Sequence, residues 1–329
     1  MKKLICCLLL GMMYLTSVEA EYYIVMSDDE RVLTAENEHV QRSIASITKI
    51  MTAVVCLEQG DYLDQWIVDD VVLSVDEKRI YLQPGQQVSM RSLLYGLMLE
   101  SGNDAAVALA QRVGGTVEKF VDMMNRKAEE LGMHNTHFNN PHGLDITQQG
   151  NLSTCFDMAL LMNYAIQNEQ FCEIIGTLTY QSEWGSVFHN SNRLLKDFPF
   201  TIGGKTGYTS KAGRTLVTAA QNQDLKLICV TFDLYDHFSF HQRQYVNAFK
   251  TIEKQVLLEV KEYMLLDSIV HVDEPFTVTC SDDELSQAEI RYWIDDNVMT
   301  IQFRLNDYIV SKCYEVSQKK MFCFLRWCL

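Results

Sequence analysis

Positive charge is in short supply in this sequence. The 329 residues include 28 lysines and arginines against 43 aspartates and glutamates, which gives a formal net charge of −15 at pH 7. Nucleic acid is not expected as a partner, because no basic patch is evident that offsets repulsion by phosphates. C-x-x-C pairs are absent as well, and no histidines occur at ligand spacing, so the sequence predicts no metal site.

Cysteines are present, ten in all, but their placement does not indicate a disulfide framework. With 47% hydrophobic residues the chain has ample core, whereas such frameworks belong to small secreted domains. Cys56 and Cys229 lie in apolar runs, which predicts buried free thiols. Pairing stays open for the later cysteines, which are Cys280, Cys313, Cys323 and Cys328.

The first 20 residues have the composition of a signal peptide. Lys2 and Lys3 form a basic start, residues 4–15 an apolar core, and residues 18–20 a small-residue cleavage site. We therefore expect the mature protein to begin at residue 21 and to be exported. An uncleaved signal anchor is the alternative.

The remaining chain has the periodicity of mixed helices and strands. A hairpin is expected over 22–26 and 31–35 and can join an antiparallel sheet formed by 177–188, 200–206, 214–220 and 225–233. Helical spacing is expected over most of 67–115 and over 120–131, 155–168 and 242–264. Residues 265–329 alternate apolar and polar side chains, so the predicted division is a domain over 21–264 and a small β-rich domain over 265–329.

The last stretch, 319–329, is apolar with basic residues. It is too short to cross a bilayer. Two interpretations remain open. The segment contacts a membrane surface through its aromatic side chains, or it packs on the small β module.

The stretch 42–60, RSIASITKIMTAVVCLEQG, is the most informative part of the chain. It is expected to form a helix capped by Ser43 and ended by Gly60. Ser46 and Lys49 are three residues apart and share one face of such a helix, and Ser46 falls in its first turn. A serine beside a lysine base is a plausible nucleophile pair.

Two further motifs give this pair its context. Ser101-Gly102-Asn103 is expected to link two helices, the second capped by Asn103, and Lys205-Thr206-Gly207 follows a strand-like segment. The ordered set Ser-x-x-Lys, Ser-x-Asn, Lys-Thr-Gly resembles the serine β-lactamases and penicillin-binding proteins. Several segments are similar to one branch of that group, the low-molecular-mass penicillin-binding proteins that are serine D-alanyl-D-alanine carboxypeptidases: RSIASITKIMTA, LLYGLMLESGNDAAVALA, FNNPHGLD, HNSNRLL and GGKTGYTSKAG.

The resemblance covers roughly residues 22–250 and implies both a fold and an activity. The implied fold is α/β, a β-lactamase/transpeptidase-like domain with an antiparallel sheet flanked by helices and an all-helical lobe, followed by a small β-rich domain. The implied activity is removal of the terminal D-alanine from peptidoglycan stem pentapeptides, with inhibition by penicillins and no cofactor. The implied location is the extracytoplasmic face of the bacterial membrane or the cell wall.

Roles follow for each motif residue on the same basis. Ser46 attacks, Lys49 takes its proton, Ser101 relays the proton to the departing D-alanine, and Asn103 holds Lys49 and the substrate. The substrate is bound by Lys205, Thr206, Gly207 and Tyr208, with the N–H groups of Ser46 and Tyr208 as the oxyanion hole. Lys205 is expected to lower the pKa of Lys49.

A few residues depart from the family pattern or stay outside it. Gly203-Gly204 stands where an isoleucine commonly precedes the lysine and could loosen the strand, and Asn151 stands where a histidine is common. His137 and His142 are interpreted as hydrogen-bond donors that order a loop. A serine β-lactamase and a non-catalytic β-lactam sensor remain as alternatives, although no residue in 134–157 matches the deacylating glutamate of class A enzymes.

Overall fold

A five-stranded antiparallel sheet organises the larger domain of the computed structural model, which describes residues 21–145, 150–265 and 268–318. The strand order is β2-β1-β11-β10-β9, so the predicted N-terminal hairpin does join the sheet. The strands are β1 (Tyr22–Ser27), β2 (Val32–Glu36), β9 (Thr201–Thr209), β10 (Gly213–Asn222) and β11 (Leu225–Phe232). Because β9 has a paired neighbour on one side only, it forms an edge of the sheet.

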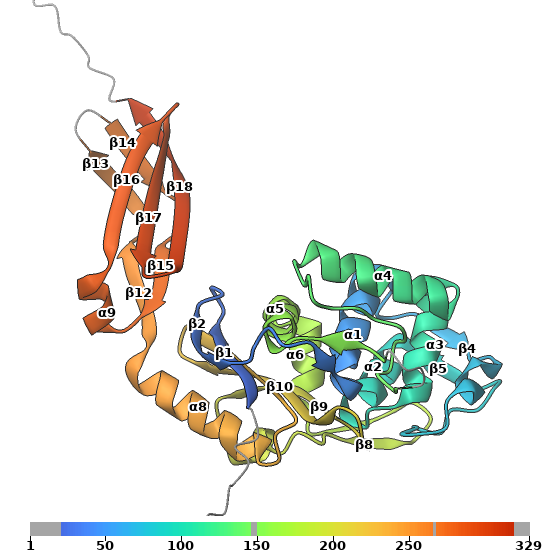
Figure 1. Cartoon of the computed structure of the whole chain (residues 1–329). Coiled ribbons are helices and arrows are strands. Elements are labelled where there is room, and N and C mark those ends of the chain that lie inside the picture. Colours follow the sequence, from blue (N-terminus) through green and yellow to red (C-terminus); the bar gives the residue numbers. More distant parts are fainter. Residues whose placement is uncertain (1–20, 146–149, 266–267, 319–329) are drawn as a thin grey trace, which may run out of the picture.

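Side-chain alternation along the strands gives the sheet two apolar faces. Ile24 of β1 packs into the main core, whereas its neighbour Val25 packs into a second cluster on the other face. The main core is covered by α1 (Lys49–Gln59), α2 (Met90–Leu99), α3 (Asn103–Gly114), α4 (Val117–Glu130), α5 (Cys155–Ala165) and α6 (Glu169–Gly176). The opposite face is covered by α7 (Leu194–Asp197) and α8 (His237–Thr251), which contribute to the second cluster. Figure 1 shows α8 on this face.

Two predicted elements in this domain are wrong. The first part of 67–115 is largely non-helical: it contains η2 (Asp70–Ser74), and β5 (Gln87–Ser89) pairs with β4 (Gln65–Ile67). The predicted strand over 177–188 is instead β7 (Thr179–Gln181) and β8 (Val187–His189), a two-stranded hairpin outside the main sheet. Gly185, at φ 88°, permits that turn. The side-chain hydroxyls of Ser89 and Thr154 cap α2 and α5.

The predicted helix over 242–264 is also wrong beyond residue 251. Ile252 takes an extended conformation, and β12 (Glu253–Leu258) pairs with β15 (Phe276–Cys280). The apolar residues that looked helical, such as Leu257 and Leu258, pack on the core of the second domain. We therefore propose to move the domain boundary from 264 to 252.

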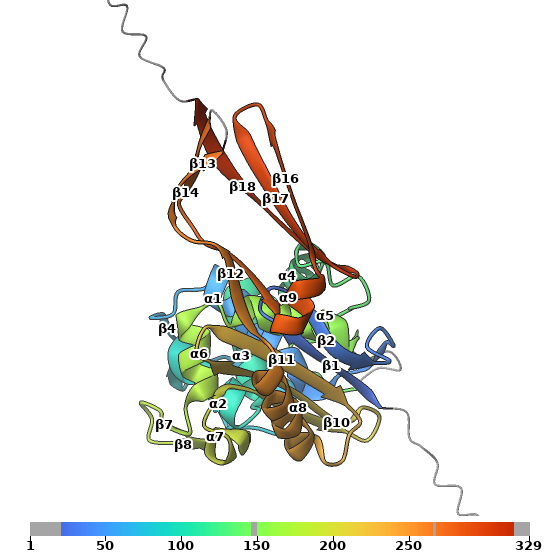
Figure 2. The same ribbon diagram turned by 90° about the vertical axis from the view of Figure 1, so that its left-hand side faces the viewer.

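The second domain is β-rich, as predicted. A five-stranded sheet of order β13-β14-β18-β17-β16 lies beside the β12–β15 pair and shares its core. The remaining elements are β13 (Lys261–Leu265), β14 (Ser268–Val272), α9 (Asp282–Gln287), β16 (Glu289–Asp295), β17 (Val298–Leu305) and β18 (Tyr308–Gln318). Figure 2 shows this domain rising from one side of the larger one, with α9 at the junction.

Paired charges hold the two domains together at the β1–β2 turn. Arg31 donates to both carboxylate oxygens of Glu284 in α9, and Lys254 of β12 donates to Asp28 at 2.8 Å. Asp29 accepts from the Tyr308 hydroxyl at 2.6 Å and from a backbone N–H of β15.

In the part of the chain that is described, no helix is long and apolar enough to cross a membrane. The predicted signal peptide and the 319–329 segment lie outside that part.

Candidate active site

Ser46 lies in a short 3₁₀ turn, η1 (Ala45–Thr48), which leads directly into α1. The expectation that Ser43 caps one continuous helix is wrong, because the Ser43 hydroxyl instead donates to Asp145 at 2.7 Å. Ala45 has a left-handed φ of 50°, so the chain bends sharply just before the nucleophile. Gly60 ends α1 as predicted, in an extended conformation.

The amine of Lys49 sits at the centre of the site and is completely buried. It lies 3.0 Å from Ser46 Oγ, 2.7 Å from Asn103 Oδ1 and 2.6 Å from the His142 carbonyl oxygen. A neutral amine has two N–H donors and one lone pair, and the amide and peptide oxygens can only accept. Both N–H groups are therefore used by Asn103 and His142, and the lone pair is left for the hydroxyl proton of Ser46.

Both lysines of the site are buried, and burial disfavours the charged form of each amine. Loss of hydration lowers the pKa of Lys49 well below its ordinary value, and the nearby ammonium of Lys205 lowers it further. The expected effect of Lys205 is thus confirmed, although burial is the larger cause. Burial also lowers the pKa of Lys205, to about 7, with a smaller contribution from Lys78.

The Ser101-Gly102-Asn103 link forms the helical wall of the site. Asn103 is the first residue of α3 and not its cap, since its side chain donates to the Glu77 carbonyl and accepts from Lys49. Ser101 has a left-handed φ of 64°, and its Oγ is buried without a hydrogen-bond partner among the described residues. An unpaired buried hydroxyl costs about 1–3 kcal/mol, which a bound ligand can recover.

Strand β9 forms the opposite wall. Lys205 Nζ donates to the Thr206 carbonyl at 2.9 Å, and the Thr206 hydroxyl lies 2.9 Å from that of Ser191. A Cβ on Gly207 would lie only 2.4 Å from Thr215 Oγ1 and 3.0 Å from the backbone nitrogen of Ser46, so the strand can approach the nucleophile only with glycine here. Tyr208 follows with 67% of its surface exposed.

The preceding pair Gly203-Gly204 stays paired with β10, next to a shift in register between Ala219 and Ala220. Both residues pair with β10, opposite Ala219 and Thr218. A Cβ on Gly203 would meet the backbone of Ile175, and one on Gly204 the carbonyl of Val217 at 2.3 Å. The two glycines therefore let α6 and β10 pack close to the strand, and β9 is continuous through them.

The site is completed by the loop that ends at Asp145 and by Asn151. Sequence reasoning assigned neither of them a part in it. Asp145 accepts from Ser43 and from Thr209, which ties the loop to the end of β9. Asn151 donates to Thr48 Oγ1 and accepts from two backbone N–H groups of the loop. The cluster of Asn and Asp in this segment was the available signal, because such side chains bind nearby backbone.

The two loop histidines donate hydrogen bonds through their backbone N–H groups, His137 to the Leu152 carbonyl and His142 to Asn140 Oδ1. His142 is buried, and its Nδ1 accepts from the Leu144 N–H. Burial and the charge of Lys49 lower the pKa of His142 to about 3, so the ring stays neutral. His137 contributes backbone bonds to Leu152. No group of three possible metal ligands occurs among the described residues.

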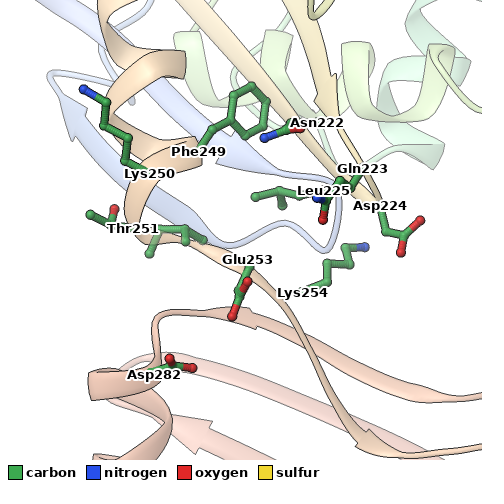
Figure 3. Close-up of a pocket in the computed structure, with 11 residues that line it drawn as sticks. Asn222, Gln223, Asp224, Leu225, Phe249, Lys250, Thr251, Glu253, Lys254 and Asp282 are labelled. Carbon is green, nitrogen blue, oxygen red and sulfur yellow. The ribbon is translucent and has the colours of Figure 1, made fainter.

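A polar pocket of about 400 Å³ lies elsewhere, at the domain junction (Figure 3). Phe249, Lys250 and Glu253 line it from the end of α8 and the start of β12, together with the β10–β11 turn. Lys254 at its edge is already paired with Asp28. The pocket contains none of the motif residues, and it therefore belongs to the junction and not to the candidate active site.

Comparison with known proteins supplies the family. A family model described as D-alanyl-D-alanine carboxypeptidase matches residues 12–235. The chain is 32% identical over 259 residues to the D-alanyl-D-alanine carboxypeptidase DacF of Bacillus subtilis, covering 70% of this chain and 66% of DacF. It is 38% identical over 216 residues to DacD of Escherichia coli, covering 61% of this chain and 54% of DacD. The match thus spans between about half and two thirds of these relatives.

Solved structures agree over most of the chain. Penicillin binding protein 5 from Haemophilus influenzae superposes with a TM-score of 0.77 at 26% identity, covering 91% of this chain and 97% of that one. Penicillin binding protein 6B from Escherichia coli gives 0.73 at 28% identity, covering 89% and 94%. A mutant of the Streptomyces K15 DD-transpeptidase gives 0.65 at 31% identity, covering 70% and 98%. The predicted fold class is confirmed, and the chain belongs to the D-alanyl-D-alanine carboxypeptidase family.

Proposed function

We propose that this protein is a serine D-alanyl-D-alanine carboxypeptidase that removes the terminal D-alanine from peptidoglycan stem pentapeptides. The observation that carries the proposal is the buried amine of Lys49, 3.0 Å from Ser46 Oγ and with a lowered pKa. A general base must be neutral and within hydrogen-bond reach of the proton that it takes. Family membership supplies the substrate class.

Acylation begins with Ser46. Its Oγ attacks the carbonyl carbon of the terminal D-Ala–D-Ala amide, and its proton passes to the lone pair of Lys49. The resulting ammonium has three acceptors at 2.6–3.0 Å, so both protonation states of Lys49 are hydrogen-bonded. Ser101, whose hydroxyl has no partner among the described residues, carries the proton to the departing amine of D-alanine.

Substrate selection depends on β9. The ammonium of Lys205 and the hydroxyl of Thr206 bind the free carboxylate at the end of the peptide, which restricts the enzyme to chain termini. Gly207 lets the peptide lie against the strand, and the N–H groups of Ser46 and Tyr208 receive the developing oxyanion. The short approach of Gly207 to Ser46 N supports this arrangement.

Water then hydrolyses the ester on Ser46 and releases the shortened peptide. Lys49 and Ser101 supply the proton transfers, so the proposed steps use no metal or cofactor. Penicillins mimic the substrate terminus and acylate the same hydroxyl. These steps take place outside the cytoplasm, with residues 1–20 as the export signal and residues 319–329 as a contact with the membrane surface.

One experiment separates this function from a β-lactamase and from a non-catalytic sensor. Purified mature protein is incubated with a pentapeptide ending in D-Ala–D-Ala and, separately, with a labelled penicillin. We expect D-alanine release and a long-lived penicillin adduct. Rapid loss of the adduct would support a β-lactamase, and an adduct without D-alanine release would support a sensor.

The nucleophile is tested with Ser46→Ala. This variant removes the attacking oxygen and leaves the lysines in place, so both D-alanine release and adduct formation are expected to disappear. An undiminished adduct in Ser46→Ala would remove Ser46 from the mechanism. Glu129→Gln, on the exposed side of α4, serves as the matched control.

A further inference from the structure

Strand β16 forms an edge of the sheet in the second domain. It is the last strand in the order β13-β14-β18-β17-β16, and among the described residues it pairs with β17 alone. All seven of its residues are exposed, none is proline, glycine or lysine, and its register with β17 runs without a bulge. Figure 2 shows the β16–β17 hairpin on the side of the domain away from β13. Because proline, lysine and bulges are the usual protection of an edge, β16 is open to pairing with a further strand.

The turn that closes this hairpin determines which backbone groups of β16 face outward. Asp295 pairs with Val298 across the turn Asp296-Asn297, whose φ angles of 44° and 66° are those of a type I′ turn. Such a turn bonds the carbonyl of Asp295 to the N–H of Val298. Bonding alternates along an antiparallel pair, so every second residue before Asp295 also bonds to β17. The N–H and C=O groups of the residues between them point away from the sheet: Ile290, Tyr292 and Ile294.

The side chains of these three residues extend the apolar core of the second domain to its edge. They lie opposite three buried core residues of β17, which are Phe303, Ile301 and Met299 in that order. Residues directly opposite each other in an antiparallel pair share a face of the sheet. Nevertheless Ile290 is 48% exposed, Tyr292 60% and Ile294 43%. The edge therefore offers both unpaired backbone groups and an apolar row to a strand that pairs with it.

The residue order of β16, Glu-Ile-Arg-Tyr-Trp-Ile-Asp, has nearly the same pattern in both directions. An antiparallel second copy centred on Tyr292 places Ile290 opposite Ile294 and pairs all the outward backbone groups. It also places Arg291 opposite Trp293, where a guanidinium over an indole ring is favourable. Centring the pair on Trp293 instead would leave the outward groups of Ile290 facing the turn of the other copy.

The charges of β16 fit the same arrangement. The carboxylate of Asp295 has neither a hydrogen bond nor an ion pair with another described residue, and it lies diagonal to Arg291 of the second copy, within reach of that long side chain. Arg291 already binds one oxygen of Glu289 at 2.6 Å, but its side chain is 63% exposed and a guanidinium has five N–H donors. It can therefore bind both carboxylates.

Two features limit the strength of such a pairing. Glu289 of one copy lies opposite Asp295 of the other, a like-charge pair that the intervening Arg291 offsets only in part. A contact formed by one seven-residue strand from each copy is also small for a protein interface. The resulting dimer is expected to be weak and to depend on protein concentration.

We propose that β16 pairs with β16 of a second copy of this chain, antiparallel and centred on Tyr292, so that the two sheets become one. The pairing generates a two-fold symmetric dimer, in which the same surface is used by both copies. The proposal concerns the second domain and does not depend on the carboxypeptidase function. D-Alanine release therefore serves as a separate check that each variant is folded.

Sedimentation of the mature protein over a range of concentrations tests the proposal. The wild type is expected to show a monomer–dimer equilibrium. Tyr292→Lys and Tyr292→Glu each place two like charges opposite each other at the centre of the pair, so each variant alone should raise the dimer Kd by roughly tenfold or more. A mixture of the two variants places Lys opposite Glu and should recover the dimer. Met264→Lys, 63% exposed on the opposite edge strand β13, is the matched control that keeps it.

Hydrogen exchange at low and high protein concentration identifies what covers the edge. We expect protection of the amides of 290–294 that increases with concentration. A chain that stays monomeric at every concentration would overturn the proposal. Protection independent of concentration would then assign the edge to residues 319–329 of the same chain, and no protection would leave it to a partner other than a second copy. A dimer that survives in Tyr292→Lys, or a mixture that stays monomeric while both variants release D-alanine, would overturn the proposal as well.

Discussion

Positive charges have opposite surroundings at the catalytic site and at the domain junction. At the catalytic site, Lys49 and Lys205 are almost fully buried, and their amines bind neutral oxygens of Ser46, Asn103 and backbone carbonyls. At the junction, Arg31 and Lys254 each meet a carboxylate. Burial without a counter-charge lowers a lysine pKa and makes a base, whereas pairing keeps the cation charged and makes a structural link.

Substitution of Lys49 has the largest expected effect. Lys49→Met removes the group that takes the Ser46 proton, so kcat/KM for D-alanine release should fall by about a thousandfold, within the range for loss of a general base. The rate of acylation by a labelled penicillin should fall as well. Both are measured on the purified protein, with Lys254→Met as the lysine control from the junction.

A second substitution separates proton transfer from hydrogen bonding. Lys49→Arg keeps donors for Asn103 and His142 but cannot become neutral, because a guanidinium stays protonated in proteins. It is expected to be as inactive as Lys49→Met. Substantial turnover in Lys49→Arg would show that the position needs donors and not a base.

Lys205 should control the alkaline side of the pH profile. The substrate carboxylate needs its ammonium, and its pKa is about 7, so kcat/KM should decline as pH rises through that value. On the acid side kcat/KM should rise with pH, because Lys49 must lose its proton and its pKa is lowered. The profile is measured with a D-Ala–D-Ala peptide, in the wild type and in Lys205→Arg.

Lys205→Arg tests the assignment of that limb. Since arginine does not titrate in this range, the decline near pH 7 should move to higher pH. A peptide with an amidated C-terminus has no carboxylate to lose and should show no such limb in the wild type. An unchanged limb in Lys205→Arg would assign it to another group.

Substitution at the domain junction is expected to lower the stability of the protein and not its activity. Arg31 is half of a two-point contact with Glu284 and also donates to the Thr279 carbonyl, so Arg31→Met should lower the free energy of unfolding by about 1–3 kcal/mol. D-Alanine release should be retained. Denaturant unfolding measures the first and the peptide assay the second. A loss of turnover comparable to that of Lys49→Met would contradict the separation of the two regions.

The same pair has a defined pH dependence. Its hydrogen bond to Arg31 lowers the pKa of Glu284 below the ordinary value of 4.5. The stabilisation is therefore present above that value and is lost as pH falls through the folded-state pKa. Below about pH 4.5 the wild type should lose more stability than Arg31→Met, which has no pair to lose.

The sequence predicted the catalytic residues better than the groups that hold them in place, and the reason is physical. Ser46 and Lys49 are three residues apart, so local helical geometry already brings them together, and the resemblance to a known family connected them to Ser101 and Lys205. The third partner of Lys49 is the backbone carbonyl of His142, and a backbone group carries no residue signature. Asp145 and Asn151 join segments about a hundred residues apart, which local pattern cannot reveal.

The errors in secondary structure have the same origin. Apolar residues over 252–264 match helical spacing, but β12 is specified by its pairing with β15 and by the second core, both distant in sequence. The strands β9, β10 and β11 were predicted well, since each next strand follows after a short turn. Long-range pairing therefore accounts for what local reasoning missed, including the boundary between the domains.

The smallest expected effect is at Lys254. Its ion pair with Asp28 measures 2.8 Å, but both side chains keep some solvent contact and only one oxygen of Asp28 is used. Such a pair contributes about 0–1 kcal/mol, because a flexible ammonium loses side-chain entropy when it is held in one position. Lys254→Met should therefore change the free energy of unfolding by less than about 1 kcal/mol and leave D-alanine release unchanged. A double-mutant cycle with Asp28→Asn measures the coupling of the pair itself, apart from other effects of each substitution. A coupling as large as that between Arg31 and Glu284 would mean that the junction depends on the number of its charge pairs and not on the two-point geometry that arginine alone provides.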